Sequence, residues 1–332
     1  MNKERNFFVL IIFGGLLLVA TSLYSITQGA TSSSFSELKI LFENFDETNP
    51  LHLLVRDVRI PRVIVASLIG FALAISGAII QGITRNPMAD PGIMGVNSGA
   101  VFMISVCYAF FSGLSFLQIT FISFLGSLFS ASLIYGISKI AVGGNNPLKL
   151  VLGGTVICSF FISLSQGIAL ATDSAQRITY WTMGSVAGSS WNDVYIALPV
   201  VVFSFVISML ISRQLTLLSI GDELSKSLGV NIGLIQKVAI LVAVALASIS
   251  VALAGMISFV GILVPHIAKK LIGNEFKFML PVCGLYGAII VSISDLLAKT
   301  LIAPSEIPIG ALISVIGVPV FLVLARRNKN EK

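Results

Sequence analysis

The chain has 332 residues, of which 56% are hydrophobic and only 11% charged, and its formal net charge at pH 7 is +6. Apolar stretches of about 20 residues, the length that a helix needs to cross the hydrocarbon core of a bilayer, recur along the chain. A large soluble protein would need many more polar surface positions, so the composition excludes that class and indicates a polytopic membrane protein.

The first segment, "MNKERNFFVLIIFGGLLLVA", has a basic head followed by an apolar run. A cleaved signal peptide begins in the same way, but no small-x-small cleavage site follows promptly. The run is also long enough to cross a bilayer. We therefore predict that it is kept as the first membrane span.

Ten transmembrane helices are predicted, and together they form one all-α membrane domain over residues 1–332. The eighth is short for a complete crossing. Their ranges are 6–27, 60–83, 95–112, 117–139, 149–171, 194–213, 236–255, 257–271, 279–298 and 309–325.

The positive charges set the orientation of these spans. An even number of spans places both termini on one side, and with the N-terminus inside, most of the 21 Lys and Arg fall in inner segments. Because cytoplasmic loops of membrane proteins are enriched in Lys and Arg, we predict a cell-membrane protein with both termini in the cytoplasm. The basic charge then reflects topology and gives no reason to expect nucleic acid as a partner.

The second predicted helix, 60–83, carries a small residue at every fourth position. Small side chains let helices approach closely in lipid, where packing must supply the attraction. We expect this stripe to hold the bundle together and not to contact substrate. It consists of Ala66, Gly70, Ala74, Ala78 and Gly82.

The next connection, "RNPMADPGIMGVNSGA" at 85–100, concentrates helix-breaking residues between two spans. Pro87 and Pro91 prevent a continuous helix, and the glycines that follow permit a compact reversal. Arg85 and Asp90 are placed to pair across that reversal. The simplest interpretation is a rigid turn at the cytoplasmic mouth.

The only substantial inner loop contains "SIGDELSKSLGVN", residues 219–231. Ser219 with Asp222 three residues later has the pattern of an N-cap, and acidic residues suit a helix N-terminus. Leu224 and Leu228 share one helix face, and the glycine after them permits a sharp C-terminal turn. The segment predicts a short helix with an exposed leucine stripe, although a loop helix without any partner would have the same pattern.

Several kinds of chemistry have no residues to carry them. The spans hold almost no ionisable groups, since only His266 and Asp295 fall near span ends, and this weakens the alternative of an ion-coupled secondary transporter. There is no Ser/His/Asp grouping, no cluster of metal ligands and no G-x-x-x-x-G-K-[ST] loop. We expect neither catalysis, nor a metal, nor a cofactor, so uphill transport needs energy from a partner.

Four blocks of sequence carry a family resemblance. The segment "GDELSKSLGV" resembles the coupling segment of permeases that import iron-siderophores and vitamin B12, which are the membrane subunits of type II ABC importers. Residues 59–100, 255–273 and 306–327 are similar to other blocks of the same family. The resemblance runs from about residue 55 to the C-terminus, and the first span and first outer loop lie outside it.

The resemblance implies a partnership. Two ten-helix permeases, identical or related, would form a central path, and two cytoplasmic ATPases would bind ATP and drive it. An external binding protein would deliver the cargo, for which a ferric siderophore is the leading expectation. Haem and cobalamin are alternatives within the family, and a secondary transporter is a distant one.

The resemblance also assigns inner residues. Two of them, Asn86 and Met88, would help to close a cytoplasmic gate, and Met88 stands where the family commonly has leucine. The coupling segment, at about 219–232, would sit in a groove of the ATPase. Its expected contacts are Gly221, Asp222, Glu223, Leu224, Leu228 and Gly229.

On the outer side, the family's cations near the "R-x-P-R" block pair with glutamates of the binding protein, and such pairs steer docking. The candidates here are Arg56, Arg59, Arg62 and Lys299. The plainer alternative for these cations is interfacial snorkelling. The fifth span would line the path, with Ser159, Ser163, Ser165 and Gln166 as its modestly polar candidates.

Overall fold

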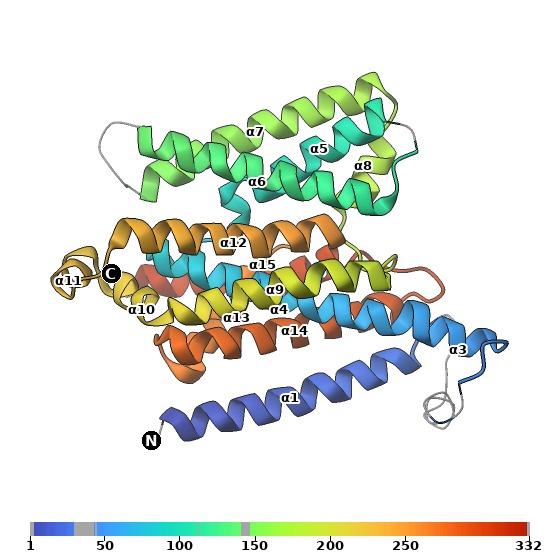
Figure 1. Ribbon diagram of the computed structural model, residues 1–332, viewed down its shortest axis with the longest axis horizontal. Coiled ribbons are helices and arrows are strands. Elements are labelled where there is room, and N and C mark those ends of the chain that lie inside the picture. The colour runs from blue at the N-terminus through green and yellow to red at the C-terminus, as the bar shows by residue number, and fades with distance from the viewer. Residues whose placement is uncertain (1–2, 30–42, 44, 112, 141–146, 331–332) are drawn as a thin grey trace.

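The computed structural model describes residues 3–29, 43, 45–111, 113–140 and 147–330, and in this part of the chain every regular element is a helix (Figure 1). Each of the ten predicted spans has a counterpart. The long helices are α1 (Lys3–Thr27), α4 (Ile60–Thr84), α5 (Val96–Phe110), α6 (Phe116–Ile140), α7 (Pro147–Ala171), α9 (Trp191–Leu210), α12 (Ile232–Ala254), α13 (Val260–Ile272), α14 (Phe276–Thr300) and α15 (Ile309–Asn330).

Seven helices among the described residues are long and apolar enough to cross a membrane. Helix α5 and the apolar part of α15, Ile309–Leu322, are shorter. Helix α13 has 13 residues, as the sequence predicted for a short eighth span. The second span is longer than predicted, because α3 (Pro50–Leu54) and a π-helical turn, η1 (Val55–Arg59), lead directly into α4 and extend the helical segment to 35 residues.

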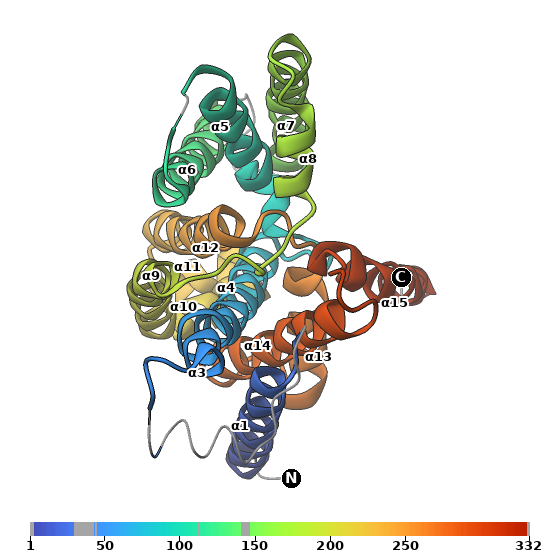
Figure 2. The same cartoon turned by 90° about the vertical axis from the view of Figure 1, so that its right-hand side faces the viewer.

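Helix α4 lies at the centre of the bundle and packs against α9, α12, α13 and α14 (Figures 1 and 2). Helices α5, α6 and α7 form a separate group on one side, and α1 lies at the opposite edge against α14. Helix α1 is mostly uncovered by the rest of the chain, as suits a helix that faces lipid on most of its surface.

Two glycine pairs explain how α4 can be so central. A Cβ added at Gly70 would come within 2.2 Å of the Gly287 carbonyl oxygen, and one at Gly77 within 2.0 Å of the Gly261 oxygen. Backbones can approach this closely only where neither residue has a side chain. The predicted small-residue stripe is thus confirmed where Gly70 meets α14, whereas the close contact with α13 is made by Gly77, which lies outside the stripe.

Short helices fill the connections. They are η2 (Pro91–Met94) between α4 and α5, α8 (Ala175–Thr182) between α7 and α9, and the consecutive α10 (Ser212–Ile220) and α11 (Asp222–Ser227) before α12. The end of the bundle that carries α11 is called the α11 end below. The first residues of α1 and the last of α15 lie at this same end (Figure 1).

Candidate functional site

The coupling segment is a short helix, as predicted, and it is closed by a glycine. Helix α11 presents Leu224 and Leu228 to solvent, with 45% and 58% of their surfaces exposed. The chain then turns at Gly229, where φ is +76°. The Gly229 N–H donates to the Lys226 carbonyl and the Val230 N–H to the Ser225 carbonyl, each at 3.0 Å, which is the Schellman pattern of helix termination.

The predicted start of this helix was wrong. Ser219 does not cap it, because Ser219 lies inside the preceding helix α10 and its hydroxyl donates to the Thr216 carbonyl at 2.7 Å. The residue that precedes α11 is Gly221, whose extended backbone separates the two helices and provides no side-chain cap. The acidic pair Asp222 and Glu223 does occupy the first turn, as predicted.

Arg85 connects the coupling segment to the turn after α4. Its guanidinium forms an ion pair with Asp222, and its Nε donates to the Leu218 carbonyl at 3.1 Å. The predicted pairing of Arg85 with Asp90 was therefore wrong. Asp90 instead accepts a hydrogen bond from the Gly92 N–H at 2.7 Å and caps η2, and burial raises the pKa of its carboxyl.

The turn after α4 is closed by one side chain. The Asn86 side-chain oxygen accepts from the Met88 N–H at 3.0 Å, and the Asn86 carbonyl accepts from the Ala89 N–H at 3.1 Å. Asn86 is exposed and Met88 half-buried. Arg85, which directly precedes Asn86, pairs with Asp222. The two predicted gate residues therefore lie at the same end of the bundle as the predicted coupling segment.

At the opposite end, Arg62 is buried and bound to two acids of the same chain. Its Nη2 lies 2.8 Å from Asp295 of α14, and its Nη1 lies 2.7 Å from Glu306, which precedes α15. Only 8% of its side chain is exposed, and 1% of that of Asp295. The ion pairs thus hold α4, α14 and the segment before α15 together.

Arg59 and Lys299 are also buried, and both reach the C-terminal end of α1. Lys299 Nζ donates to the carbonyl and hydroxyl oxygens of Ser25 at 2.6 and 2.8 Å, and Arg59 Nη1 donates to the Ile26 carbonyl at 2.9 Å. The last carbonyls of a helix attract cations, which accounts for both contacts. These two residues and Arg62 therefore form inward contacts within the chain, and a docking role for them stays a prediction.

Arg56 is the exposed member of the predicted cluster. Its side chain is 43% exposed, forms an ion pair with Asp57 at 2.9 Å, and lies over the Phe45 ring at 4.5 Å. The Trp191 indole N–H donates to the Arg56 carbonyl at 2.9 Å and fixes this part of the backbone. Arg56 remains a docking prediction.

The predicted path residues of α7 separate into two groups. Ser159, Ser163 and Gln166 are exposed and share one helix face by their spacing. Ser165 is buried, and its hydroxyl donates to the Phe161 carbonyl at 2.7 Å, so it does not face the expected path.

The charge network at the end opposite α11 was missed in the sequence, although a signal was present. Asp295 lies in the otherwise apolar predicted span 279–298, and Lys299, four residues further on, follows the end of that span directly. Ionisable residues inside membrane helices usually pair with one another within the protein. That rule favours internal partners over docking for these residues. Among the described residues, no group of three or more His, Cys, Asp or Glu is arranged to hold a metal ion.

A bundle of membrane-length helices with a short exposed helix between two of them has the architecture of an ABC importer permease. A solved structure described by the words "metal-chelate type ABC transporter", in an inward-facing conformation, matches it with a TM-score of 0.84 and 29% identity over 96% of this chain and 98% of that one. The FecCD transport family model matches residues 17–327, and the chain belongs to this family.

Two curated relatives show the range of cargo in the family. The chain is 39% identical, over 97% of its length and 84% of the relative's, to the iron(3+)-hydroxamate import system permease protein FhuB of Bacillus subtilis (strain 168). It is 33% identical, over 96% of its length and 95% of the relative's, to the hemin transport system permease protein HmuU of Yersinia pestis. The first name describes import of iron(3+)-hydroxamate and the second describes transport of hemin.

Proposed function

We propose that this chain is the permease subunit that carries a ferric siderophore through the cell membrane into the cytoplasm. A second permease completes the path, two ABC ATPases supply the energy of ATP, and an external binding protein delivers the chelate. The observation that carries the proposal is that α11 exposes Leu224 and Leu228 at one end of the bundle, where an ATPase can bind them. The similarity to an iron-hydroxamate permease supports the cargo.

The proposed orientation places the α11 end in the cytoplasm. The start of α1 and the end of α15 lie at that end, so both termini are cytoplasmic (Figure 1). The enrichment of Lys and Arg in cytoplasmic segments supports this assignment. On the same proposal, α7 lines the path with its exposed Ser159, Ser163 and Gln166.

Reconstitution tests this function directly. The chain, with its partner permease, ATPases and binding protein, is placed in liposomes and supplied with labelled ferric hydroxamates, ferric citrate, haem and cobalamin. We expect ATP-dependent uptake of a ferric siderophore that is insensitive to ionophores. Uptake of haem or cobalamin alone would assign the alternative cargo, and uptake that follows an ion gradient without ATP would overturn the proposal in favour of a secondary transporter.

Gly229→Val is expected to uncouple ATP hydrolysis from uptake. No atom lies within 4 Å of a Cβ added there, so the effect comes from the backbone, because a β-branched residue does not tolerate a φ of +76°. A residue in this conformation costs about 1–2 kcal/mol, enough to reshape the end of α11. ATPase activity and uptake are measured together in proteoliposomes.

Gly229→Asn is the matched control, because asparagine adopts the left-handed conformation more readily. It should retain most of the coupling. Equal uptake per ATP in the valine variant and the wild type would contradict the role of this turn.

Exchange of the charges in the Arg85–Asp222 pair tests the link between gate turn and coupling segment. Each single reversal, Arg85→Glu or Asp222→Arg, brings like charges together, and we expect uptake to fall about five-fold, which corresponds to roughly 1 kcal/mol for an exposed pair. The double variant restores the attraction and should recover uptake. Additive losses in the double variant would indicate that the two residues act separately.

Asn86→Ala is expected to slow transport or make the gate leak. The variant loses the acceptor of the Met88 N–H, and a lost turn hydrogen bond costs about 1 kcal/mol. Chelate efflux from loaded proteoliposomes without ATP measures the leak. If both efflux and uptake equal those of the wild type, the turn is structural only.

Docking of the binding protein is proposed to use Arg56, the exposed cation at the end opposite α11. Rim charges act mainly on the association rate and its salt dependence. Arg56→Glu should therefore slow association with the binding protein at low salt. An unchanged association rate would remove Arg56 from the docking surface.

A further inference from the structure

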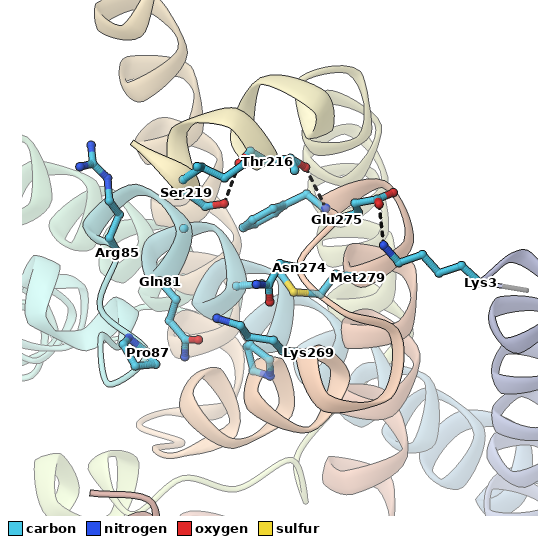
Figure 3. A pocket seen from close by; sticks show the side chains of 15 residues that line it. Lys3, Gln81, Arg85, Pro87, Thr216, Ser219, Lys269, Asn274, Glu275 and Met279 are labelled. Carbon is cyan, nitrogen blue, oxygen red and sulfur yellow. Dashed lines mark hydrogen bonds and ion pairs between the residues drawn. The ribbon is translucent and has the colours of Figure 1, made fainter. Parts of the chain in front are cut away.

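A cavity of about 470 Å³ lies at the α11 end, beside the turn after α4 that carries the predicted gate residues (Figure 3). It is enclosed by the start of α1, the last turn of α4, α10, and the end of α13 with the start of α14. Part of its lining is apolar and includes Ala78, Pro265, Phe276 and Met279. The polar part includes three cations.

The charge of the lining is unbalanced. The lining contains three cations, Lys3, Arg85 and Lys269, but only one acid, Glu275, which pairs with Lys3 at 2.5 Å (Figure 3). Arg85 pairs outside the cavity with Asp222. Lys269 has no carboxylate partner in the part of the chain that the structure describes.

Two side-chain amides line the cavity together with Lys269 (Figure 3). The Nε2 of Gln81 already donates to the Gly261 and Ile262 carbonyls at 3.1 and 3.4 Å, so Asn274 is the amide that can donate to a ligand. A cavity with an unpaired ammonium, an amide donor and apolar lining residues suits an oxygen-rich anion attached to an apolar group.

We propose that this cavity binds a phosphate ester, as presented by the headgroup of an anionic phospholipid, with Lys269 as its main cation. Basic pockets between transmembrane helices on the cytoplasmic side suit such headgroups. The helix that contributes Lys3 leaves Phe8 and Ile12 each 62% exposed within the next three turns, a surface that fits acyl chains. The leaflet rests on the orientation proposed above.

The position of the site gives the lipid a role. The cavity also includes Thr216, Ser219 and Ile220 of α10, the helix that leads into the coupling segment. A headgroup held between Lys269 of α13 and Lys3 of α1 braces α10 against both helices. Anionic lipid thus strengthens the support of the coupling segment.

Lys269 also has a plainer explanation, because a positive charge in the last turn of α13 stabilises the end of that helix. Lys270 shares that position in the helix, is equally exposed, and does not line the cavity. A comparison of variants at these two lysines therefore distinguishes a lipid site from a general effect of charge at the helix end.

The test uses the purified full chain in neutral detergent, titrated with phosphatidylglycerol, phosphatidylcholine or glycerol phosphate. Retained lipid is measured by native mass spectrometry and stability by the thermal unfolding midpoint. We expect phosphatidylglycerol to bind and to raise the midpoint, and Lys269→Gln to weaken its binding about five-fold, the effect of one lysine near a membrane surface. Lys270→Gln should bind as the wild type does.

Glycerol phosphate distinguishes the sources of the phosphate ester. No shift with glycerol phosphate assigns the site to lipid, and a Lys269-dependent shift with it supports the site with a soluble ester as ligand. Equal losses in Lys269→Gln and Lys270→Gln, or no loss in either, would overturn the proposal. Because the readout needs no transport, its failure is distinguishable from failure of the proposed function.

Discussion

Replacing Arg62 by methionine is expected to lower the free energy of unfolding by about 3–5 kcal/mol, the usual cost of removing one partner of a buried ion pair. The cost arises because Asp295, with only 1% of its side chain exposed, loses three hydrogen bonds from the guanidinium. Glu306 is less affected, since 37% of its side chain reaches solvent. The thermal or denaturant midpoint of the purified chain in detergent measures the loss.

Arg56→Met is the control for this experiment. Arg56 lies nearly two helical turns earlier in the same helical segment, but its side chain is exposed and its partner Asp57 is 46% exposed. Exposed ion pairs contribute little to stability, so this variant should unfold at nearly the wild-type midpoint. Equal midpoints for the two variants would mean that the buried network does not hold α4, α14 and the segment before α15 together.

A second variant distinguishes the loss of the ion pair from a general failure to fold. When both members of a buried pair are replaced by apolar residues, the change is often neutral or stabilising. Arg62→Met with Asp295→Leu should therefore recover much of the stability that Arg62→Met loses. If the double variant is no more stable than the single one, the cost comes from packing around Arg62 and not from the unpaired carboxylate.

The helices could be predicted from the sequence because each is encoded locally. A run of apolar residues long enough to cross a bilayer is sufficient evidence of a span, and the predicted ranges agree with the ten long helices. Local rules also account for α11, whose exposed leucines and terminal glycine are separated by only a few residues. They did not reveal that α10 ends only at Ile220, so Ser219 was assigned to the wrong helix.

The side-chain network could not be predicted in the same way. Arg62 meets Asp295 across 233 residues and Glu306 across 244, and Arg85 meets Asp222 across 137. These pairs depend on which helices are neighbours and at what rotation, which hydrophobic periodicity does not specify. A cation near a span end is compatible with docking, snorkelling or internal pairing, and only the packing decides among them.

The small-residue stripe could be predicted only in part, unlike the helices, which could be predicted, and the side-chain network, which could not. Its spacing identified the face of α4 that packs closely, but not its partners. Those partners are Gly287 of α14 for Gly70, Gly261 of α13 for Gly77 and the Phe276 ring for Gly82. Gly77 stands outside the predicted series of every fourth residue, because α4 packs against more than one helix and each contact has its own line of small residues.

Gly70→Leu is expected to prevent the chain from reaching its folded state, or to reduce the folded yield at least ten-fold. Even its Cβ would lie 2.2 Å from the Gly287 carbonyl oxygen and 2.9 Å from Val291 Cβ, and both are held within the packed pair of α4 and α14. Overpacking a core usually costs about 1–3 kcal/mol, and a clash with backbone, which cannot rotate away, lies at or beyond the upper end of that range. Folded yield after extraction and size-exclusion chromatography measures the effect.

Gly15→Leu, in the lipid-facing helix α1, is the matched control. No atom lies within 4 Å of a Cβ at Gly15, so the same substitution adds apolar surface without a clash and should leave the folded yield unchanged. The ratio of uptake between different chelates distinguishes a packing role from substrate contact. Those Gly70→Leu molecules that do fold should keep the wild-type ratio. A normal yield with an altered ratio would instead place Gly70 on the path. It would also show that the close approach of α4 and α14 does not require glycine at this position.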